Sequence, residues 1–261
     1  MKFGILQFPG SCDDIDALHA ARRVGDAEPI WHADRDLHGA DAIVVPGGFS
    51  YGDYLRAGAI ARFAPAMESV IEFAREGGLV LGICNGFQVL CEAHLLPGAL
   101  LGNVNLRFTS RQVDLDVIDP ETSFTRACAR AREEVGVGVG VGVGVGVGVG
   151  GGVGGGETIG EMKEASPVRL SIPAKHSWGR YYADEDALAE LEGRGQVVLR
   201  YAEGQNFNGS LHDIAGVRNE TGNVFGMMPH PEHAVEKLVG ESSDGLRIFE
   251  SMRLAVKGAR V

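Results

Sequence analysis

The fold is decided by the stretch Leu79-Val80-Leu81-Gly82-Ile83-Cys84-Asn85-Gly86, in which an apolar run ends at a cysteine flanked by two glycines. The apolar run is typical of a buried strand, and the residues after Gly86 have the apolar spacing of a helix. This arrangement predicts a nucleophile elbow, a sharp strand-to-helix turn that projects the central side chain from the sheet edge. The positive end of the following helix would favour a thiolate over a thiol. Cys84 is therefore a candidate nucleophile, and the competing interpretation is a buried cysteine in a glycine-rich turn.

Short apolar runs alternate with amphipathic segments through the first half of the chain. The pattern predicts strands at residues 2–8, 29–32, 41–45 and 79–83, helices at 13–24 and 59–75, and a third helix after Cys84. The second half predicts strands at residues 104–108, 112–117, 168–172, 197–201, 214–218 and 224–228, and a closing helix at 244–256. Such alternation is typical of a single-domain α/β fold with a mainly parallel central sheet flanked by helices, as in flavodoxin-like proteins.

A low-complexity tract interrupts this pattern at residues 135–156, where Val and Gly alternate and then give way to glycine-rich sequence. Glycine at every second position costs backbone entropy on folding and leaves little side chain to pack. We therefore predict one domain over residues 1–261 that contains a flexible loop at residues 135–156.

Net charge, apolar runs and cysteine content exclude several classes of function and location. The formal net charge is −11, which argues against a nucleic-acid partner, because phosphate neutralisation requires clustered basic residues. No run approaches the roughly 20 apolar residues of a membrane span, and residues 2–8 have the pattern of a strand and not of a signal peptide. Four cysteines lack the spacing of a zinc site and are too few for a secreted disulfide scaffold. These features predict a cytoplasmic protein with reduced thiols, in which Cys12, Cys91 and Cys128 serve packing.

A thiol nucleophile needs a base, and the segment Met228-Pro229-His230-Pro231-Glu232-His233 offers one. If the two prolines hold this segment extended, the side chains of His230 and Glu232 project to the same side. The carboxylate can then fix the imidazole tautomer while the other ring nitrogen faces the thiol. A lone histidine after a strand is more often structural, so the catalytic interpretation depends on the Cys84 elbow.

A glycine pair follows the predicted strand at 41–45, in the loop Val45-Pro46-Gly47-Gly48-Phe49-Ser50-Tyr51-Gly52-Asp53. Such a loop can aim a backbone N–H at a substrate, so Gly48 and the N–H of Asn85 could form an oxyanion hole. A plain tight turn is the alternative interpretation.

With these motifs, the chain resembles the class I (triad) glutamine amidotransferases, and among them the glutaminase subunits of phosphoribosylformylglycinamidine synthase. The resemblance covers nearly the whole chain and is carried by residues 46–58, 82–90, 208–210 and 222–232. It implies that Cys84 attacks the side-chain amide of L-glutamine, that His230 acts as general base and then acid, and that Glu232 orients His230. It also implies an oxyanion hole at Gly48 and Asn85, and no metal in this chain. The substrate-binding residues implied by the resemblance are Gln88, Phe49, Arg107 and Phe108.

The resemblance also implies partners and one local departure. The chain has no Gly-Lys-Ser or Gly-Lys-Thr and hence no P-loop. The family's ATP and magnesium are used by a large synthetase subunit that receives the ammonia, and a small third subunit helps assembly; this chain itself carries no cofactor. At residues 175–182 the sequence departs from the family, because Ser177 and Trp178 replace the usual Gly and Glu.

Three alternatives stay open at this point. The chain could be a triad amidotransferase that serves GMP, pyridoxal phosphate or histidine synthesis. It could be a free-standing cysteine peptidase or deglycase of the DJ-1/PfpI kind on a similar sheet. It could also be a pseudoenzyme that only supports a complex.

Overall fold

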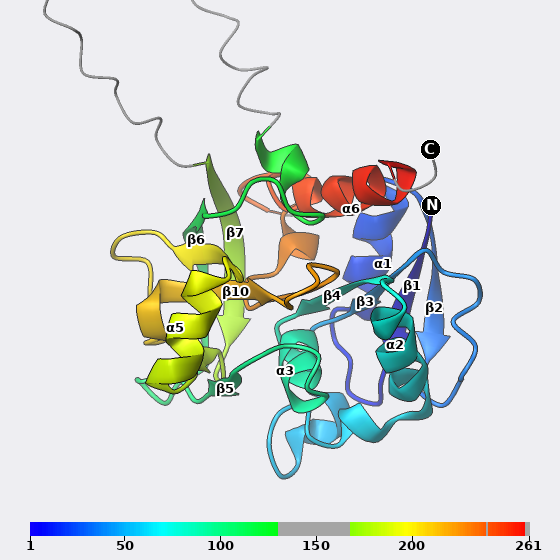
Figure 1. Cartoon of the computed structure of the whole chain (residues 1–261), viewed down its shortest axis with the longest axis horizontal. Coiled ribbons are helices and arrows are strands. Elements are labelled where there is room, and N and C mark those ends of the chain that lie inside the picture. The colour runs from blue at the N-terminus through cyan, green and yellow to red at the C-terminus, as the bar shows by residue number, and fades with distance from the viewer. Residues whose placement is uncertain (130–167, 239, 259–261) are drawn as a thin grey trace, which may run out of the picture.

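One nine-stranded sheet crosses the molecule in the computed structural model, which describes residues 1–129, 168–238 and 240–258 (Figure 1). From edge to edge its strands are β2 (Asp26–Trp31), β1 (Lys2–Gln7), β3 (Ala42–Val45), β4 (Leu79–Ile83), β11 (Val224–Met227), β10 (Ile214–Arg218), β9 (Val197–Tyr201), β6 (Thr109–Val117) and β7 (Val168–His176). Among the described helices, none is both long and apolar enough to cross a membrane.

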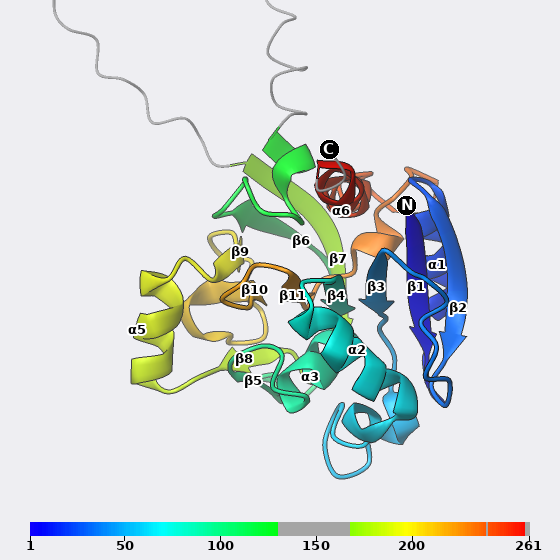
Figure 2. The same cartoon turned by 45° about the vertical axis from the view of Figure 1, so that its right-hand side comes forward.

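The half of the sheet from β2 to β11 is parallel throughout. Its order, β2-β1-β3-β4-β11, reverses direction between β1 and β3, as in flavodoxin-like sheets, which confirms the predicted α/β fold. Right-handed crossovers on the two sides of that reversal place their helices on opposite faces. Helix α1 (Asp14–Arg22) accordingly covers one face with α6 (Leu246–Gly258), and α2 (Pro65–Arg75) and α3 (Asn85–Glu92) cover the other (Figure 2).

The half from β10 to β7 is antiparallel and extends the same sheet. It carries α5 (Glu185–Gly193) and a small two-stranded sheet of β5 (Ala99–Leu101) and β8 (Arg180–Tyr182). Short 3-10 helices complete the fold: η1 (Ser50–Asp53), η2 (Ala61–Phe63), η3 (Leu211–Asp213) and η4 (Pro231–His233). The predicted parallel core is therefore joined to an antiparallel wing that brings β7 beside the segment after β11, as the hydrogen bond from the His230 N–H to the Pro173 carbonyl shows (2.8 Å).

The predicted strand at residues 104–108 is wrong. These residues form a turn in which the Leu106 N–H donates to the Asn103 carbonyl (2.9 Å) and the Asn103 amide donates to the Arg107 carbonyl (3.0 Å). Leu106 adopts a φ of 53° and its side chain is exposed. Alternating apolar residues in a loop therefore gave a false strand pattern.

Two prolines account for the other main differences. The predicted helix at 59–75 begins only at Pro65, because Ala64 before it is extended (φ −63°, ψ 143°), the conformation that a residue preceding proline prefers. Strand β7 continues beyond the predicted 168–172 and through Pro173 to His176. Proline is tolerated there because β7 is an edge strand.

Smaller corrections concern the ends of elements. Strand β2 starts three residues before the predicted 29–32, and α6 lies two residues beyond the predicted 244–256. Helix α5 was not expected, although Asp184 caps it by accepting from the Ala187 N–H (2.8 Å). The loop predicted at residues 135–156 lies outside the described residues and stays a prediction.

The tight junction of β4 and α3 can be tested at Gly86. A Cβ placed there would lie 1.9 Å from the Val45 carbonyl oxygen, whereas a Cβ at Gly193, at the end of α5, meets nothing within 4 Å. We expect Gly86→Ala to destabilise the fold by roughly 1 to 3 kcal/mol through overpacking. Gly193→Ala should be neutral or stabilising by up to about 1 kcal/mol, because alanine is the better helix former. Urea denaturation measures both, and equal midpoints for the two variants would contradict this account.

Candidate active site

Cys84 stands at the junction of β4 and α3 with a φ of 50° and a ψ of −104°. This positive φ is rare for a residue with a side chain and marks a strained backbone. The two flanking glycines make it feasible, since a Cβ at Gly82 would approach the Gly86 backbone to 2.9 Å. The predicted elbow is therefore present, and the Cys84 side chain is almost fully buried.

His230 and Glu232 follow β11, the strand that pairs with β4. The His230 Nδ1 lies 2.6 Å from the Glu232 Oε1, and both side chains are buried. The sequence predicted this contact from an extended segment, but residues Pro231–His233 form the 3-10 helix η4. A tight turn, and not strand alternation, therefore brings the carboxylate to the ring.

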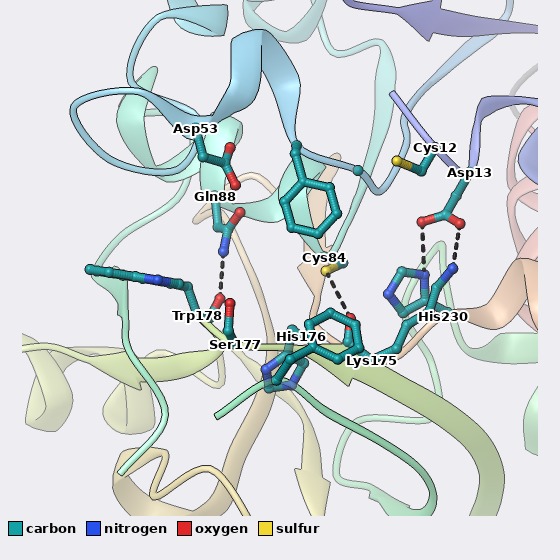
Figure 3. Close-up of a pocket in the computed structure, with 13 residues that line it drawn as sticks. Cys12, Asp13, Asp53, Cys84, Gln88, Lys175, His176, Ser177, Trp178 and His230 are labelled. Atoms are coloured by element: carbon teal, nitrogen blue, oxygen red, sulfur yellow. Dashed lines mark hydrogen bonds and ion pairs between the residues drawn. The ribbon is translucent and has the colours of Figure 1, made fainter. Parts of the chain in front are cut away.

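Cys84 and His230 line one cavity, which encloses about 470 Å³ of empty space (Figure 3). Its walls are Cys12, Asp13, Gly48, Phe49, Asp53, Cys84, Gln88, Phe108, Lys175, His176, Ser177, Trp178 and His230. The cavity lies beyond the carboxyl ends of β1, β3, β4 and β11, where the strand order reverses and where ligands bind in such sheets. The expected meeting of thiol and imidazole in one cleft is thus observed.

The surroundings of His230 favour its charged form. Burial alone lowers the pKa of this histidine, but the Glu232 carboxylate and the sulfur of Cys84 outweigh burial and hold its pKa above the ordinary value. The Nε2 atom of His230 is buried and has no hydrogen-bond partner among the described residues. An imidazolium whose one nitrogen is held by a carboxylate can donate its other proton toward the sulfur or a leaving group.

The two N–H groups predicted for an oxyanion hole are both free of hydrogen-bond partners in the described part of the chain. Gly48 has a φ of 147°, and a Cβ there would approach the Gly10 carbonyl oxygen to 2.7 Å. The bridge between Ser11 and Gly48 fixes this loop while the Gly48 N–H stays unbonded. Free backbone donors beside a nucleophile are what a tetrahedral oxyanion requires.

The residues that the resemblance implied for substrate binding are only partly brought together. Gln88, Phe49 and Phe108 line the cavity, and Gln88 donates to the Trp178 carbonyl. Arg107 is exposed and does not belong to the cavity lining, although its neighbour Phe108 does. Its role in substrate binding stays a prediction without structural support here.

The Asn85 side chain has a role that the sequence did not reveal. Its oxygen accepts from the Ser50 N–H (3.0 Å), and its amide nitrogen donates to Asp53 Oδ1 (3.0 Å) and Gln88 Oε1 (2.8 Å). This buried amide thereby ties the glycine loop after β3 to the first turn of α3. Ser50 and Asp53 precede Asn85 by 35 and 32 residues, so no local sequence pattern pointed to these contacts.

Further cavity residues were also missed by the sequence analysis. Asp13 and Lys175 form a partly buried ion pair at one wall. His176 also lines the cavity, and burial and the charge of His230 lower its pKa to about 3. Cys12, which was expected to serve packing, is exposed and lines the cavity. Cys91 and Cys128 are buried as expected, and burial raises the pKa of both thiols.

The segment with Ser177 and Trp178, for which the sequence predicted a departure from the family, forms the cavity wall that faces α3. Its polar contacts use the main chain, since the Ser177 carbonyl accepts from the Asn103 N–H (2.8 Å) and the Trp178 carbonyl accepts from Gln88. The Trp178 ring is half-exposed at the cavity opening (Figure 3). The side chains at these two positions therefore contribute to the rim, while the hydrogen bonds of the wall use the main chain.

One group of side chains has the donor types of a metal site. Donor atoms of Asp13, His230, Glu232 and His233 all lie within 4.8 Å of one another. However, the Asp13 carboxylate is paired with the Lys175 ammonium, and Glu232 is paired with His230. Both carboxylates already have a cationic partner, so the arrangement fits a hydrogen-bonded network better than a metal site.

A cysteine on a strand-to-helix elbow, sharing a cavity with a carboxylate-bound histidine at the edge of a flavodoxin-like sheet, is the arrangement of a cysteine triad hydrolase. The comparisons with known proteins agree: the CobB/CobQ-like glutamine amidotransferase domain matches residues 1–144 and 161–254. The chain therefore belongs to the glutamine amidotransferases, and, at about 50% identity over nearly its whole length, to the family of phosphoribosylformylglycinamidine synthase subunits PurQ. It is an enzyme of that class.

The relatives that place it there are similar over nearly their whole length. The PurQ subunit of Mycolicibacterium paratuberculosis is 52% identical over 253 residues, which are 96% of each chain. That of Rubrobacter xylanophilus is 50% identical over 98% of this chain and 100% of its own. The solved structure of PurLQS from Thermotoga maritima matches with a TM-score of 0.76 and 36% identity over 98% of both chains.

A more distant solved structure shares the fold at low sequence identity. A putative GMP synthase component from Thermoplasma acidophilum matches with a TM-score of 0.58, but at 15% identity, over 100% of this chain and 96% of its own. That likeness supports the fold alone. The identity near 50% to PurQ subunits therefore answers the question that the sequence left open among triad amidotransferases.

The packing between His230 and Asp13 can be tested at Gly47. A Cβ there would lie 2.4 Å from Asp13 Oδ2 and 2.8 Å from His230 Cε1. We expect Gly47→Ala to displace these groups and to lower the rate of glutamine hydrolysis roughly 100-fold, as misplacement near 1 Å does. Gly102→Ala, where a Cβ meets nothing within 4 Å, is the matched control and should retain the rate. Steady-state glutamate release compares them, and a fully active Gly47→Ala variant would contradict the proposed geometry.

Proposed function

We propose that this chain hydrolyses L-glutamine through a thioester on Cys84 and supplies the ammonia to a synthetase partner. The observation that carries the proposal is the shared cavity of Cys84 and His230, in which Glu232 binds the far side of the imidazole at 2.6 Å. This is the arrangement that activates a thiol and later protonates a leaving group.

The first half of the reaction releases ammonia. The Cys84 sulfur attacks the side-chain amide carbon of glutamine, and the carbonyl oxygen becomes an oxyanion held by the N–H groups of Gly48 and Asn85. His230 then donates its Nε2 proton to the amide nitrogen, the carbon–nitrogen bond breaks, and ammonia leaves. The glutamyl group remains on sulfur as a thioester.

The second half restores the enzyme. His230, now neutral, accepts a proton from a water molecule that attacks the thioester carbon. The carbon–sulfur bond breaks, glutamate leaves, and the thiolate and imidazolium form again. Throughout both steps Glu232 keeps the Nδ1 proton in place, so the reactive nitrogen is always Nε2.

The names of the relatives and the exposed apolar side chains near the cavity support a synthetase partner. The Thermotoga maritima structure is described as PurLQS, and the curated relatives are subunits of phosphoribosylformylglycinamidine synthase. Phe49 and Trp178, which line the cavity, are each 48% exposed, and Tyr54 and Leu55 on the same loop as Phe49 are 74% and 90% exposed. Apolar side chains gathered at an opening are typical of an interaction surface. We propose that the large synthetase subunit binds over this opening, and that a small third subunit helps assembly.

The synthetase chemistry belongs to that partner. Conversion of formylglycinamide ribonucleotide to formylglycinamidine ribonucleotide requires activation by ATP with magnesium, and no P-loop occurs in this sequence. We place the nucleotide and its metal on the large subunit, with no cofactor on this chain. The cytoplasmic location expected from the sequence fits this role in purine synthesis.

The central test replaces the nucleophile in the assembled complex. Cys84→Ala should abolish product formation from glutamine and spare product formation from ammonium, because only the first route uses the thiol. Cys91→Ala is the matched control and should retain both routes, since Cys91 is buried against the Pro97 carbonyl away from the cavity. Comparing the two nitrogen donors with the synthetase subunits present gives the answer. Retention of glutamine-dependent synthesis by Cys84→Ala would refute the proposal.

A second test concerns metal dependence. A glutamine-mimicking diazoketone should alkylate Cys84 at the same rate with and without EDTA, because the carboxylates near His230 are already paired with cations. Mass spectrometry of the labelled peptide measures the rate. A fall in labelling with EDTA that added zinc or magnesium reverses would show that this chain needs a metal.

A further inference from the structure

Asp13 is a buried carboxylate that its local structure does not explain. It stands at the N-cap position of α1, where aspartate ordinarily accepts from the helix's own first N–H groups. Here its side chain makes no capping hydrogen bond, and the residue is only 3% exposed. A buried carboxylate that does not cap its helix must be stabilised by other contacts.

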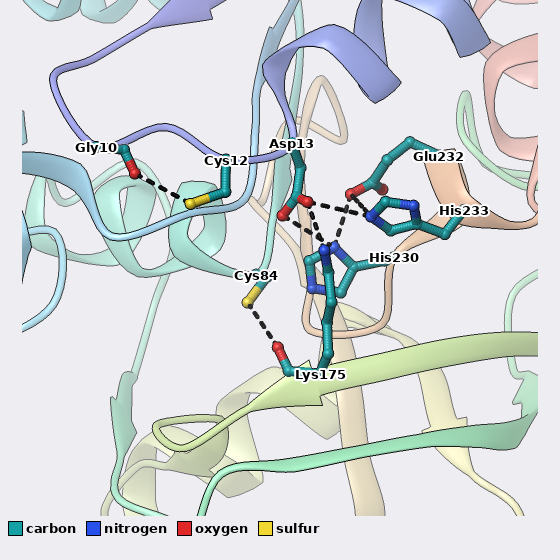
Figure 4. A network of polar contacts seen from close by, with 8 residues as sticks. All are labelled: Gly10, Cys12, Asp13, Cys84, Lys175, His230, Glu232 and His233. Atoms are coloured by element: carbon teal, nitrogen blue, oxygen red, sulfur yellow. Dashed lines mark hydrogen bonds and ion pairs between the residues drawn. The ribbon is translucent and has the colours of Figure 1, made fainter.

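Those contacts come from two other parts of the chain (Figure 4). The Lys175 ammonium, from strand β7, donates to Asp13 Oδ1. The ring of His233, in η4, lies with Nε2 3.1 Å from the same oxygen. Asp13 therefore joins the loop after β1 to the antiparallel wing and to the segment that carries His230.

The other Asp13 oxygen faces the catalytic histidine. Asp13 Oδ2 lies 3.6 Å from His230 Nδ1, the nitrogen that Glu232 Oε1 approaches to 2.6 Å. Two carboxylates thus lie near the same ring nitrogen: Glu232 at hydrogen-bond distance, and Asp13 at a longer distance. Gly47 makes this approach feasible, since any Cβ there would occupy the space between Asp13 and His230.

The charges around the pair are complementary. Burial alone raises the pKa of Asp13, but the hydrogen bonds from His233 and Lys175 and the charge of His230 hold it well below its usual range. The titratable groups that face His230 are Cys84 beyond β4, Glu232 and His233 of η4, Asp13 before α1, and Lys175 and His176 of β7. Asp13 therefore remains an anion throughout the range in which an imidazolium at position 230 would act.

We propose that Asp13, held by Lys175 and His233, is a second carboxylate that positions His230 against Cys84 and favours its charged form. It is a positioning residue, since it acts through His230 and not on substrate. The inference rests on the proposed roles of Cys84 and His230. It also gives the antiparallel wing a part in the site, because Lys175 of β7 holds Asp13 in place.

The test uses Asp13→Asn in the complex with the synthetase subunits. Asparagine keeps the shape and removes the charge, so the cation at His230 loses a stabilising neighbour. The alkaline limb of the pH profile of kcat/KM for glutamine reports loss of the imidazolium as pH rises through its pKa. We expect that limb to move to lower pH by about one unit, and kcat for glutamine to fall roughly 10- to 100-fold with little change in KM.

Three further variants serve as controls for this test. Asp16→Asn removes the same charge from the first turn of α1, outside the cavity lining, and should leave both the profile and the rate as in the wild type. Lys175→Met should lower kcat as Asp13→Asn does, since the carboxylate is no longer held in place, but it removes a cation and so should not move the alkaline limb to lower pH. Lys175→Arg should restore most of the rate by keeping the cation. Ammonium-dependent synthesis reports the integrity of each complex and should stay unchanged.

The outcomes separate this inference from the proposed function. If Asp13→Asn lowers the rate but leaves the alkaline limb in place, or lowers glutamine- and ammonium-dependent synthesis equally, Asp13 is only structural and the inference is overturned. If Cys84→Ala retains glutamine-dependent synthesis, the proposed function itself fails. Loss of glutamine use in Cys84→Ala together with a shifted profile in Asp13→Asn supports both.

Discussion

The pairing of β4 with β11 is the constraint on which the site depends. The two strands run parallel, with Gly82 beside Gly226 and Ile83 beside Met227, and the Cys84 N–H donates to the Met227 carbonyl (2.8 Å). Residues distant in sequence therefore leave the sheet at the same level and on the same edge. A slip in this register by one residue would turn the side chains of β4 to the other face and separate the thiol from the imidazole. The meeting of the Cys84 thiol and the His230 imidazole therefore depends first on the pairing of β4 with β11.

Burial gives this arrangement its electrostatic character. His230, Glu232 and Asp13 are all nearly inaccessible to solvent, where isolated charges would be costly. They are maintained because each anion has a cation within reach, and because Lys175 extends from an edge strand to complete the set. The surrounding hydrocarbon excludes water, so these pairs interact more strongly than surface pairs of the same geometry do. The antiparallel wing therefore contributes electrostatics as well as a cavity wall.

The sequence was most informative where a local pattern determines local structure. The run at residues 79–83 and the two glycines around Cys84 predicted β4 and the elbow correctly, because apolar content and the steric demand of the turn are properties of those residues themselves. The contact of His230 with Glu232 was also expected, although through the wrong backbone geometry. In both cases the partners are close in the chain. Contacts between distant segments were beyond the reach of such patterns: Asp13 stands at the N-cap position of α1 without capping it, and its partner Lys175 lies 162 residues further on. The turn at residues 104–108 imitated a strand because its exposed apolar residues alternate as a strand's would.

The wall built from residues 176–178 has a consequence for how this protein can vary. At positions 177 and 178 its hydrogen bonds to Asn103 and Gln88 are accepted by peptide carbonyls, which every amino acid possesses. Selection can therefore exchange the outward groups at positions 177 and 178 without dismantling the support beneath them. A change of side chain at position 178 alters what the rim offers to a neighbouring molecule, so substitutions at these two positions would be matched by compensating substitutions on the surface that meets them.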